Sequence, residues 1–151
     1  MDDRAFTVRA DRVTLLAVMS TTQLSLRTRG RNEFVDVTRE VTDAVRTAGL
    51  AEGICTVYVP HTTAGITINE NADPSVVHDM LAHLEKLVPE QGAYAHAEGN
   101  SDSHIKASMM GSSVTVPVTG GRLALGTWQG IYFCEFDGPR GRSYIVTVVA
   151  G

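Results

Sequence analysis

The order of strand-like and helix-like segments is the feature that most constrains the fold of this chain. Segments rich in β-branched residues lie near both ends of the sequence, and two helical segments lie between them without alternating regularly with the strands. A regular alternation is typical of a doubly wound parallel sheet, whereas this order favours an α+β fold with a mixed, mostly antiparallel sheet. Because 151 residues are enough to bury one core, we expect a single compact domain over residues 1–151.

Two amphipathic helices account for most of the predicted helical structure. In the first, Asp36 is the expected N-cap, apolar residues recur at helical spacing, and Gly49 provides a left-handed stop. In the second, Asp73 is the expected N-cap, Pro74 lies in the first turn, and the helix ends before Pro89. The apolar stripe of this second helix comprises Val77, Met80, Leu81, Leu84, Leu87 and Val88.

The strands are predicted from alternating apolar residues and from the turns between them. Residues 54–60 are apolar at both alternate sets of positions, which indicates a strand covered on both faces, and residues 65–69 are a candidate partner for it. A Gly120-Gly121 turn predicts a hairpin, and residues 137–141 predict a turn between the last two strands. The predicted strands are 5–10, 21–28, 54–60, 65–69, 113–118, 122–126, 131–136 and 144–149.

Charge and hydropathy argue against two classes of partner. The net charge is −4, and the basic residues are scattered apart from a group at 27–31, which we interpret as a solvated turn. Non-specific nucleic-acid binding depends on clustered basic residues that release counterions, so no nucleic-acid partner is expected. No apolar stretch reaches the length of a membrane span, so no membrane partner is expected either.

The amino terminus and the cysteines favour a cytoplasmic location. Residues 1–4 have the wrong charge order for a signal peptide. Cys55 and Cys134 lie in apolar strand-like runs without neighbouring thiols or histidines, so we expect both to be buried and reduced. A disulfide or a metal pair is the alternative.

The polar stretch 96–110 is the strongest candidate for a functional site. It carries two histidines, two carboxylates, an amide, three hydroxyls and a lysine. A short helix is expected from about residue 101 to residue 110, with Ile105 and Met109 as its contact with the core. The candidate site residues in this stretch are Glu98, Asn100, Ser101, Asp102, His104 and Lys106. For Asp102 and Lys106, four residues apart, the alternative is a surface helix pair worth roughly 0.2–0.5 kcal/mol.

Further candidates precede this stretch. His61 follows a predicted strand and is flanked by Thr62 and Thr63. A histidine at such a position can ligate a metal, bind phosphate or transfer a proton, and the alternative is a hydrogen bond within a turn. Glu70 and Asn71 could reach a cation or a hydroxyl group.

Four more candidates follow it. Trp128 could stack on a flat heterocycle whose polar edge Gln129 would read, although a single tryptophan is more often a core or interface residue. Glu135 lies in an apolar strand run, where a carboxylate needs a partner, and Arg140 is the nearest positive charge. The alternative to this structural ion pair is that Arg140 and Lys106 hold a phosphate.

Several long motifs, in the right order, resemble one protein family. They are residues 60–63 (PHTT), 69–73 (NENAD), 98–108 (EGNSDSHIKAS) and 125–140 (LGTWQGIYFCEFDGPR). They closely resemble the YjbQ-like family, often called secondary thiamine-phosphate synthases, and the match covers nearly the whole chain after the first twenty residues. The family pattern leads us to expect alanine at position 103, where this chain has Ser103.

The resemblance implies a mixed, partly closed sheet of barrel or sandwich type and a homotrimer with polar pockets near its subunit interfaces. It also implies a weak thiamine-phosphate synthase activity, which joins a hydroxymethylpyrimidine diphosphate to a thiazole phosphate. The expected ligand is therefore a small phosphorylated heterocycle, or phosphate itself. No nucleotide cofactor is expected, because the sequence has no glycine-rich phosphate loop or dinucleotide-binding pattern.

These residues support three hypotheses about function. The first is a transferase in which His61, His104, Lys106, Glu135 and Arg140 act on the phosphorylated substrates. The second is a metal-binding or phosphate-binding trimer, and the third is metal-assisted hydrolysis of a phosphate ester. A divalent metal, Mg²⁺ or Zn²⁺, would draw its ligands from His61, His104, Asp102, Glu70 and Glu98.

Overall fold

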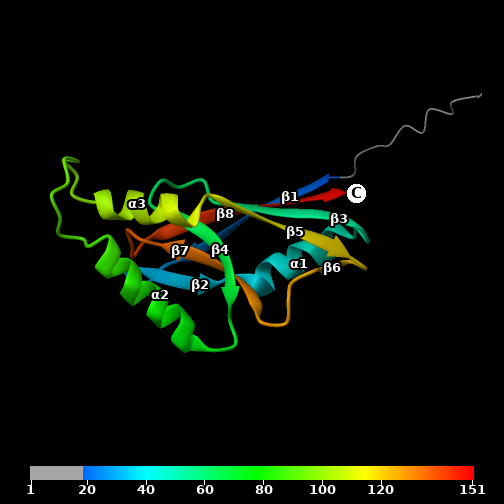
Figure 1. The fold of residues 1–151 in the computed structure, drawn as a ribbon. Coiled ribbons are helices and arrows are strands. Elements are labelled where there is room, and N and C mark those ends of the chain that lie inside the picture. Colours follow the sequence, from blue (N-terminus) through cyan, green and yellow to red (C-terminus); the bar gives the residue numbers. More distant parts are fainter. Residues whose placement is uncertain (1–18) are drawn as a thin grey trace, which may run out of the picture.

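The computed structural model describes residues 19–151, which form one α+β unit, as the sequence predicts (Figure 1). The strand predicted at 5–10 lies outside the described residues. The elements are β1 (Met19–Arg27), β2 (Glu33–Asp36), α1 (Thr38–Ala48), β3 (Gly53–Tyr58), β4 (Ala64–Glu70), α2 (Pro74–Leu87), α3 (Ser101–Met110), β5 (Ser113–Thr119), β6 (Arg122–Leu123), β7 (Gln129–Glu135) and β8 (Gly141–Ala150). None of these helices is long and apolar enough to cross a membrane.

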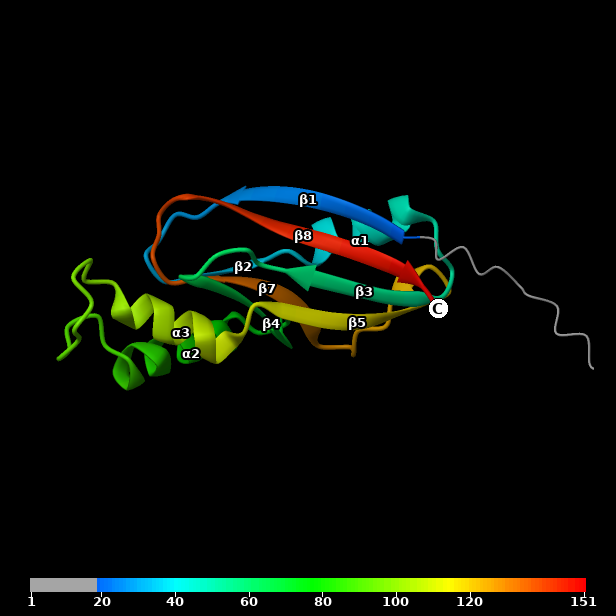
Figure 2. The same cartoon turned by 90° about the horizontal axis from the view of Figure 1, so that it is seen from above.

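The strands form two sheets rather than one. A five-stranded sheet has the order β1-β8-β3-β5-β6, and its first four strands lie side by side in Figure 2. A three-stranded sheet has the order β2-β7-β4. Every pairing among the described strands is antiparallel, so the sheets are not mixed as the prediction had it. The predicted pairing of 65–69 with 54–60 is wrong, because β4 pairs with β7 while β3 lies between β5 and β8.

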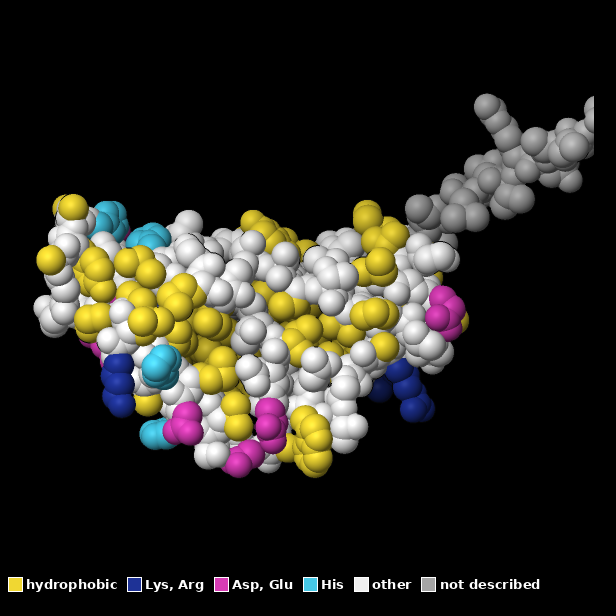
Figure 3. All heavy atoms as spheres, viewed as in Figure 1, with side chains coloured by type: hydrophobic (Ala, Val, Ile, Leu, Met, Phe, Trp, Pro, Cys, Tyr) yellow, Lys and Arg dark blue, Asp and Glu magenta, His cyan; other side chains and the backbone are white. Residues whose placement is uncertain are grey.

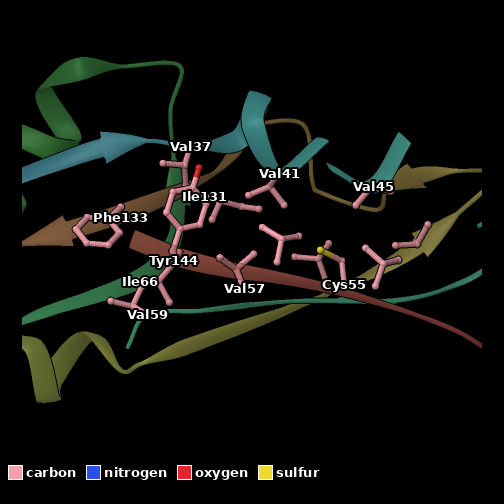
Figure 4. Packing of buried hydrophobic residues seen from close by; sticks show 14 of the residues in the cluster. Val37, Val41, Val45, Cys55, Val57, Val59, Ile66, Ile131, Phe133 and Tyr144 are labelled. Carbon is pink, nitrogen blue, oxygen red and sulfur yellow. The ribbon is translucent and has the colours of Figure 1, made fainter. Parts of the chain in front are cut away.

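The main core lies between the five-stranded sheet, α1 and one face of the three-stranded sheet. Val41 and Val45 of α1 point toward Cys55 and Val57 of β3, and Phe133 of β7 closes the other end (Figure 4). All five side chains are at most 1% exposed. Burial raises the pKa of the Cys55 thiol to about 11 and also raises that of Cys134, so both free cysteines remain protonated.

Strand β7 is covered on both faces, whereas β3 is not. Ile131 and Phe133 of β7 face the main core, and Tyr132 and Cys134 face a second cluster formed with α2 and α3. Ile54 and Tyr58 of β3 are 51% and 44% exposed, so the expected two-sided covering of 54–60 is wrong for the single chain. The reason is that α2 and α3 pack on the three-stranded sheet, so no helix of residues 19–151 covers the outer face of the five-stranded sheet. The helices therefore cover β7 of the three-stranded sheet, whereas the apolar pattern predicted a strand covered on both faces at residues 54–60.

The helix boundaries agree closely with the capping signals. Gly49 ends α1 with a φ of 68°, and the Asp73 side chain accepts a hydrogen bond from the Ser75 backbone N–H at 2.8 Å. The α1 cap differs by one residue, because Val37 is the N-cap. Asp36 still satisfies the first turn, since its Oδ1 accepts from the Thr38 N–H at 2.9 Å.

Helix α3 has the predicted bounds but buries the opposite face. Ile105 and Met109 are 41% and 47% exposed, whereas Asp102 and Lys106 are at most 1% exposed. The polar side chains can lie inward because they find charged partners there, which the spacing of apolar residues does not reveal. The end of α3 packs closely on β4 at Gly65, where an added Cβ would lie 2.7 Å from the Gly111 carbonyl oxygen.

Candidate functional site

A cavity between the segment after β3 and helix α3 brings together three of the predicted site residues. It has a volume of about 510 Å³ and is lined by His61, Thr62 and His104. Ser108 and Ser112, at the end of α3 and just beyond it, add two hydroxyls. We call it the His61–His104 cavity. In Figure 3, histidine side chains gather at the end of the molecule where α2 and α3 lie.

The hydrogen bonding of His61 determines what its imidazole can offer. The Ser143 backbone N–H donates to His61 Nε2 at 3.1 Å. Burial, followed by the nearby positive charge of Arg142, lowers the pKa of His61 below its ordinary value, so the ring is neutral at pH 7. A neutral imidazole has one N–H and one lone pair, and the lone pair on Nε2 is used. The proton therefore lies on Nδ1, where it can donate a hydrogen bond to a ligand oxygen.

A buried ion pair lies close to His61. Arg142 Nε donates to Glu135 Oε2 at 2.7 Å, and Arg142 Nη2 donates to Glu135 Oε1 and to Thr63 Oγ1. Thr28 Oγ1 and two backbone N–H groups also donate to the same carboxylate. Burial is the largest influence on the pKa of Glu135 and raises it, but the hydrogen bonds and charge of Arg142, with the Asp137 N–H, lower it below the ordinary value.

The partner of Glu135 is Arg142 rather than the predicted Arg140. Arg140 is half exposed, and its Nη2 lies 3.0 Å from Asp137 Oδ2. The correct partner could have been found from β8 itself, where Arg142 occupies the same alternate set of positions as the buried Tyr144. A charged residue at an inward-facing strand position needs a buried partner of opposite charge.

A second charged network holds the inner face of α3. Lys106 Nζ lies 2.7 Å from Glu85 Oε2 of α2 and 3.1 Å from Asp102 Oδ2. Arg31 Nη2 lies 3.0 Å from Asp102 Oδ1, so the group 27–31 is not merely a solvated turn. The pair of Asp102 and Lys106 is buried and not on the surface, and Lys106 faces carboxylates instead of the His61–His104 cavity. Asn100 joins this network through a hydrogen bond to Asp137 Oδ2 at 3.1 Å.

Four other predicted residues lie at the far end of β4. Because β4 starts at the cavity and runs for seven residues, Glu70 and Asn71 lie roughly 20 Å from it along the strand. The Asn71 backbone N–H donates to the Trp128 carbonyl at 2.9 Å, which ties the two segments together. Trp128 is 62% exposed, and Gln129 Oε1 accepts from the Gly126 N–H at 2.8 Å. These residues form a separate group within one chain.

The remaining candidates lie beside the cavity. Ser101, at the start of α3, lines a neighbouring cavity with His96 and His104. Glu98 is exposed, and its Oε2 lies 3.8 Å from His96 Nε2.

The expected metal ligands do not come together in one chain. His61 has its lone pair engaged by Ser143, Asp102 is enclosed by Arg31 and Lys106, and Glu70 lies at the far end of β4. Within residues 19–151, no three His, Cys, Asp or Glu side chains are placed to hold an ion. The described residues of one chain therefore do not bring the predicted ligands together, and the metal stays a prediction.

Comparison with known proteins gives a consistent result. Residues 22–151 match the model of a family described as UPF0047 protein YjbQ-like. A UPF0047 protein of Methanocaldococcus jannaschii is 47% identical over 135 residues, which cover 89% of this chain and 98% of that protein. The UPF0047 protein YugU of Bacillus subtilis is 50% identical over 127 residues, which cover 83% of this chain and 96% of that protein.

Solved structures extend the similarity to the whole fold. An uncharacterized conserved protein of the YjbQ/UPF0047 family from Clostridium acetobutylicum is 54% identical, with a TM-score of 0.83 over 84% of this chain and 98% of that one. A YbjQ-like protein of unknown function from Sulfolobus solfataricus is 30% identical, with a TM-score of 0.86 over 89% of this chain and 99% of that one.

Proposed function

The chain belongs to the UPF0047 YjbQ-like family, and we propose that it is a transferase of the thiamine-phosphate synthase type that binds a phosphorylated heterocycle in the His61–His104 cavity. The observation that carries the proposal is the convergence of His61, Thr62 and His104 on one cavity of about 510 Å³. That volume suits a small ligand.

The cavity offers hydrogen-bond donors in an environment that favours negative charge. His61 presents its Nδ1–H, and the hydroxyls of Thr62 and Ser112 can also donate. The charge of Arg142 lowers the pKa of His61, that of Glu135 raises it by less, and that of Arg140 lowers it further, so a phosphate in the cavity would meet a net positive charge. Hydrogen bonds to a charged acceptor are the stronger ones, which supports a phosphate over a neutral group.

The chemistry of this transfer places few demands on acids or bases. The thiazole nitrogen forms a bond to the methylene carbon of hydroxymethylpyrimidine diphosphate as the bond from that carbon to oxygen breaks. Diphosphate leaves with the electron pair of that bond, and the nitrogen, having used its lone pair, acquires the positive charge of a thiazolium. No proton has to move, so His61 and His104 need only orient the substrates and stabilise negative charge.

Lys106 then has a positioning role. It is enclosed by Glu85 and Asp102 on the inner face of α3, and it fixes the helix that presents His104 on another face. Arg140 is half exposed and pairs with Asp137, and its charge would act on a bound phosphate as it acts on His61.

The proposal is tested by assaying the purified protein with both substrates. His61→Ala and His104→Ala are each expected to lower turnover by roughly 10- to 100-fold, the loss that follows removal of a hydrogen bond to a charged group. His83→Ala is the matched control, because His83 is exposed on α2 and does not line the cavity. Turnover that is unchanged in both cavity variants would overturn the assignment.

The same preparation separates the two alternative functions. Elemental analysis that finds stoichiometric zinc in the wild type and none in His61→Ala would mean that His61 is a ligand and not a donor. A screen in which phosphate esters are hydrolysed without a second substrate would favour a hydrolase.

We also propose that the protein is a homotrimer that buries the outer face of the five-stranded sheet. The strand register aligns an apolar row of Met19, Val149, Ile54 and Pro117 across this face, next to a row of Thr21, Thr147, Thr56 and Thr115. Neither row carries a charge, so two such faces can meet without repulsion. A monomeric mass by light scattering would contradict this. The two free thiols fit a reducing compartment, and we propose the cytoplasm.

A further inference from the structure

A second cavity adjoins the first and shares one wall with it. It has a volume of about 530 Å³ and lies between the loop that precedes α3 and the first half of that helix. The loop contributes Tyr94, Ala95 and His96, and the helix contributes Ser101 and His104. His104 therefore lines both this cavity and the His61–His104 cavity. A ligand longer than either cavity could extend past this one imidazole.

The walls of the second cavity consist largely of rings and small apolar groups. The rings of His96 and His104 lie with their centroids 5.4 Å apart and their planes at 81°, so one presents its edge to the face of the other. Tyr94 is held in place by its hydroxyl, which donates to the Pro89 carbonyl at 2.8 Å. Ile105 adds an aliphatic surface, and Ser101 adds a hydroxyl. Flat rings pack well against surfaces of this kind, and a hydroxyl can donate a hydrogen bond to a ring nitrogen.

The charges around the second cavity disfavour a phosphate. Among the described residues, no Lys or Arg side chain lines either cavity, so the difference lies in the charges just outside each one. The carboxylate of Glu98 lies 3.8 Å from His96 Nε2 and would repel an anion bound there. By contrast, the positive charges of Arg142 and Arg140 together outweigh the carboxylate of Glu135 at His61, in the other cavity. The two cavities therefore differ in the part of a phosphorylated heterocycle that each accommodates.

We propose that the second cavity binds the flat heterocyclic ring of a ligand whose phosphate lies in the His61–His104 cavity, with His104 between the two parts. This inference rests on the proposed function, because it assumes that the first cavity takes the phosphate. It adds a recognition site for the ring, and it makes His96 and Tyr94 determinants of which heterocycle is accepted.

The test compares a whole ligand with its phosphate alone. Binding of a thiazole phosphate and of inorganic phosphate is measured by calorimetry on the wild type, on Ala95→Trp, which fills the second cavity, and on Ala97→Trp. Ala97 is an exposed residue of the same loop that does not line the cavity, so it is the matched control. His96→Ala is a second variant that removes one ring without filling the space. Circular dichroism and thermal unfolding establish that each variant is folded.

The expected result is selective. Ala95→Trp should weaken binding of the thiazole phosphate by roughly tenfold or more, as loss of ring stacking does, while inorganic phosphate binds within about twofold of wild type. His96→Ala should act in the same direction, and Ala97→Trp should leave both affinities unchanged. Equal affinity of wild type and both cavity variants for the thiazole phosphate would overturn this inference alone. Failure of the proposed function has a different signature, namely inorganic phosphate binding that His61→Ala and His104→Ala leave intact.

Discussion

Replacing Arg142 by methionine isolates the cost of an unpaired buried carboxylate. Glu135 is 0% exposed and receives hydrogen bonds from Arg142, Thr28 Oγ1 and two backbone N–H groups. Breaking a buried ion pair by removing one partner typically costs about 3–5 kcal/mol. Because Glu135 keeps three donors after Arg142→Met, we expect the lower end, about 3 kcal/mol. For a chain of this length that corresponds to a fall of roughly 6–12 °C in Tm.

The pH dependence of this cost follows from the pKa of Glu135. In the wild type that pKa is lowered, so the carboxylate contributes stability above its unfolded pKa of about 4.3, and the contribution is lost as pH falls through the folded pKa. In Arg142→Met, burial still raises the pKa of Glu135, but the hydrogen bonds and positive charge of Arg142 that lower this pKa are lost. The folded variant then takes up a proton more readily than the unfolded chain. The difference in stability between wild type and variant should therefore shrink as pH falls from 7 toward 4.5.

The assay is urea unfolding at fixed protein concentration, at pH 7 and at two lower pH values. Arg140→Met is the matched control, because Arg140 is half exposed and its pair with Asp137 should contribute under about 1 kcal/mol. A loss of less than 1 kcal/mol for Arg142→Met at pH 7 would refute the reasoning. So would a difference from wild type that stays constant with pH.

Two further predictions concern α3 and His61. Lys106→Met should cost about 3 kcal/mol, because it leaves Arg31 as the one ion-pair partner of Asp102 among the described residues. Met109→Lys, at a site that is 47% exposed, should cost under about 1 kcal/mol. Chemical denaturation measures both, and the reverse order would contradict the observed orientation of the helix. Burial and then Arg142 lower the pKa of His61, so the unfolded chain binds more protons below about pH 6.5 and the wild type should lose stability there as pH falls. His61→Gln should lack this component in a series of thermal melts, and an unchanged profile would show that His61 is not buried as a neutral ring.

The sequence predicts the local structure of this protein better than its layers. Gly49 and Asp73 mark helix ends because capping depends on neighbouring residues, and both act as predicted. The pairing of β4 was wrong because strand partners depend on contacts far apart in the chain, and β4 could meet β3 or β7 with the same alternation. The apolar residues of 54–60 occupy both faces of the strand, which predicts a strand buried on both sides. A face that is exposed in one chain and available to a partner has the same pattern.

In the candidate site, too, the sequence predicts single residues better than the partners that they contact. His61 and His104 were identified from their polar surroundings, and both line one cavity. The partner of Glu135 was missed because Arg140 and Arg142 lie two residues apart and would share one face of a strand, so the sequence pattern does not distinguish them. They differ because β8 begins at Gly141, which leaves Arg140 in the preceding turn and places Arg142 in the strand. The burial of Lys106 could not be inferred from α3 alone, because its partner Glu85 belongs to a different helix.

The position of β8 has a consequence for how the molecule is made. This strand, the last in the chain, lies between β1 and β3, and the contact between Thr21 and Thr147 spans 126 residues. During synthesis β1 leaves the ribosome before β3 and β5, yet its partner strand β8 follows them, so the larger sheet cannot assemble until β8 has been made. Folds dominated by such distant pairings form slowly and expose unpaired strand edges while they wait. Loss of β8 would remove the strand that joins β1 to the rest of the sheet, and would leave unpaired the edges of β1 and β3 that β8 covers in the native molecule.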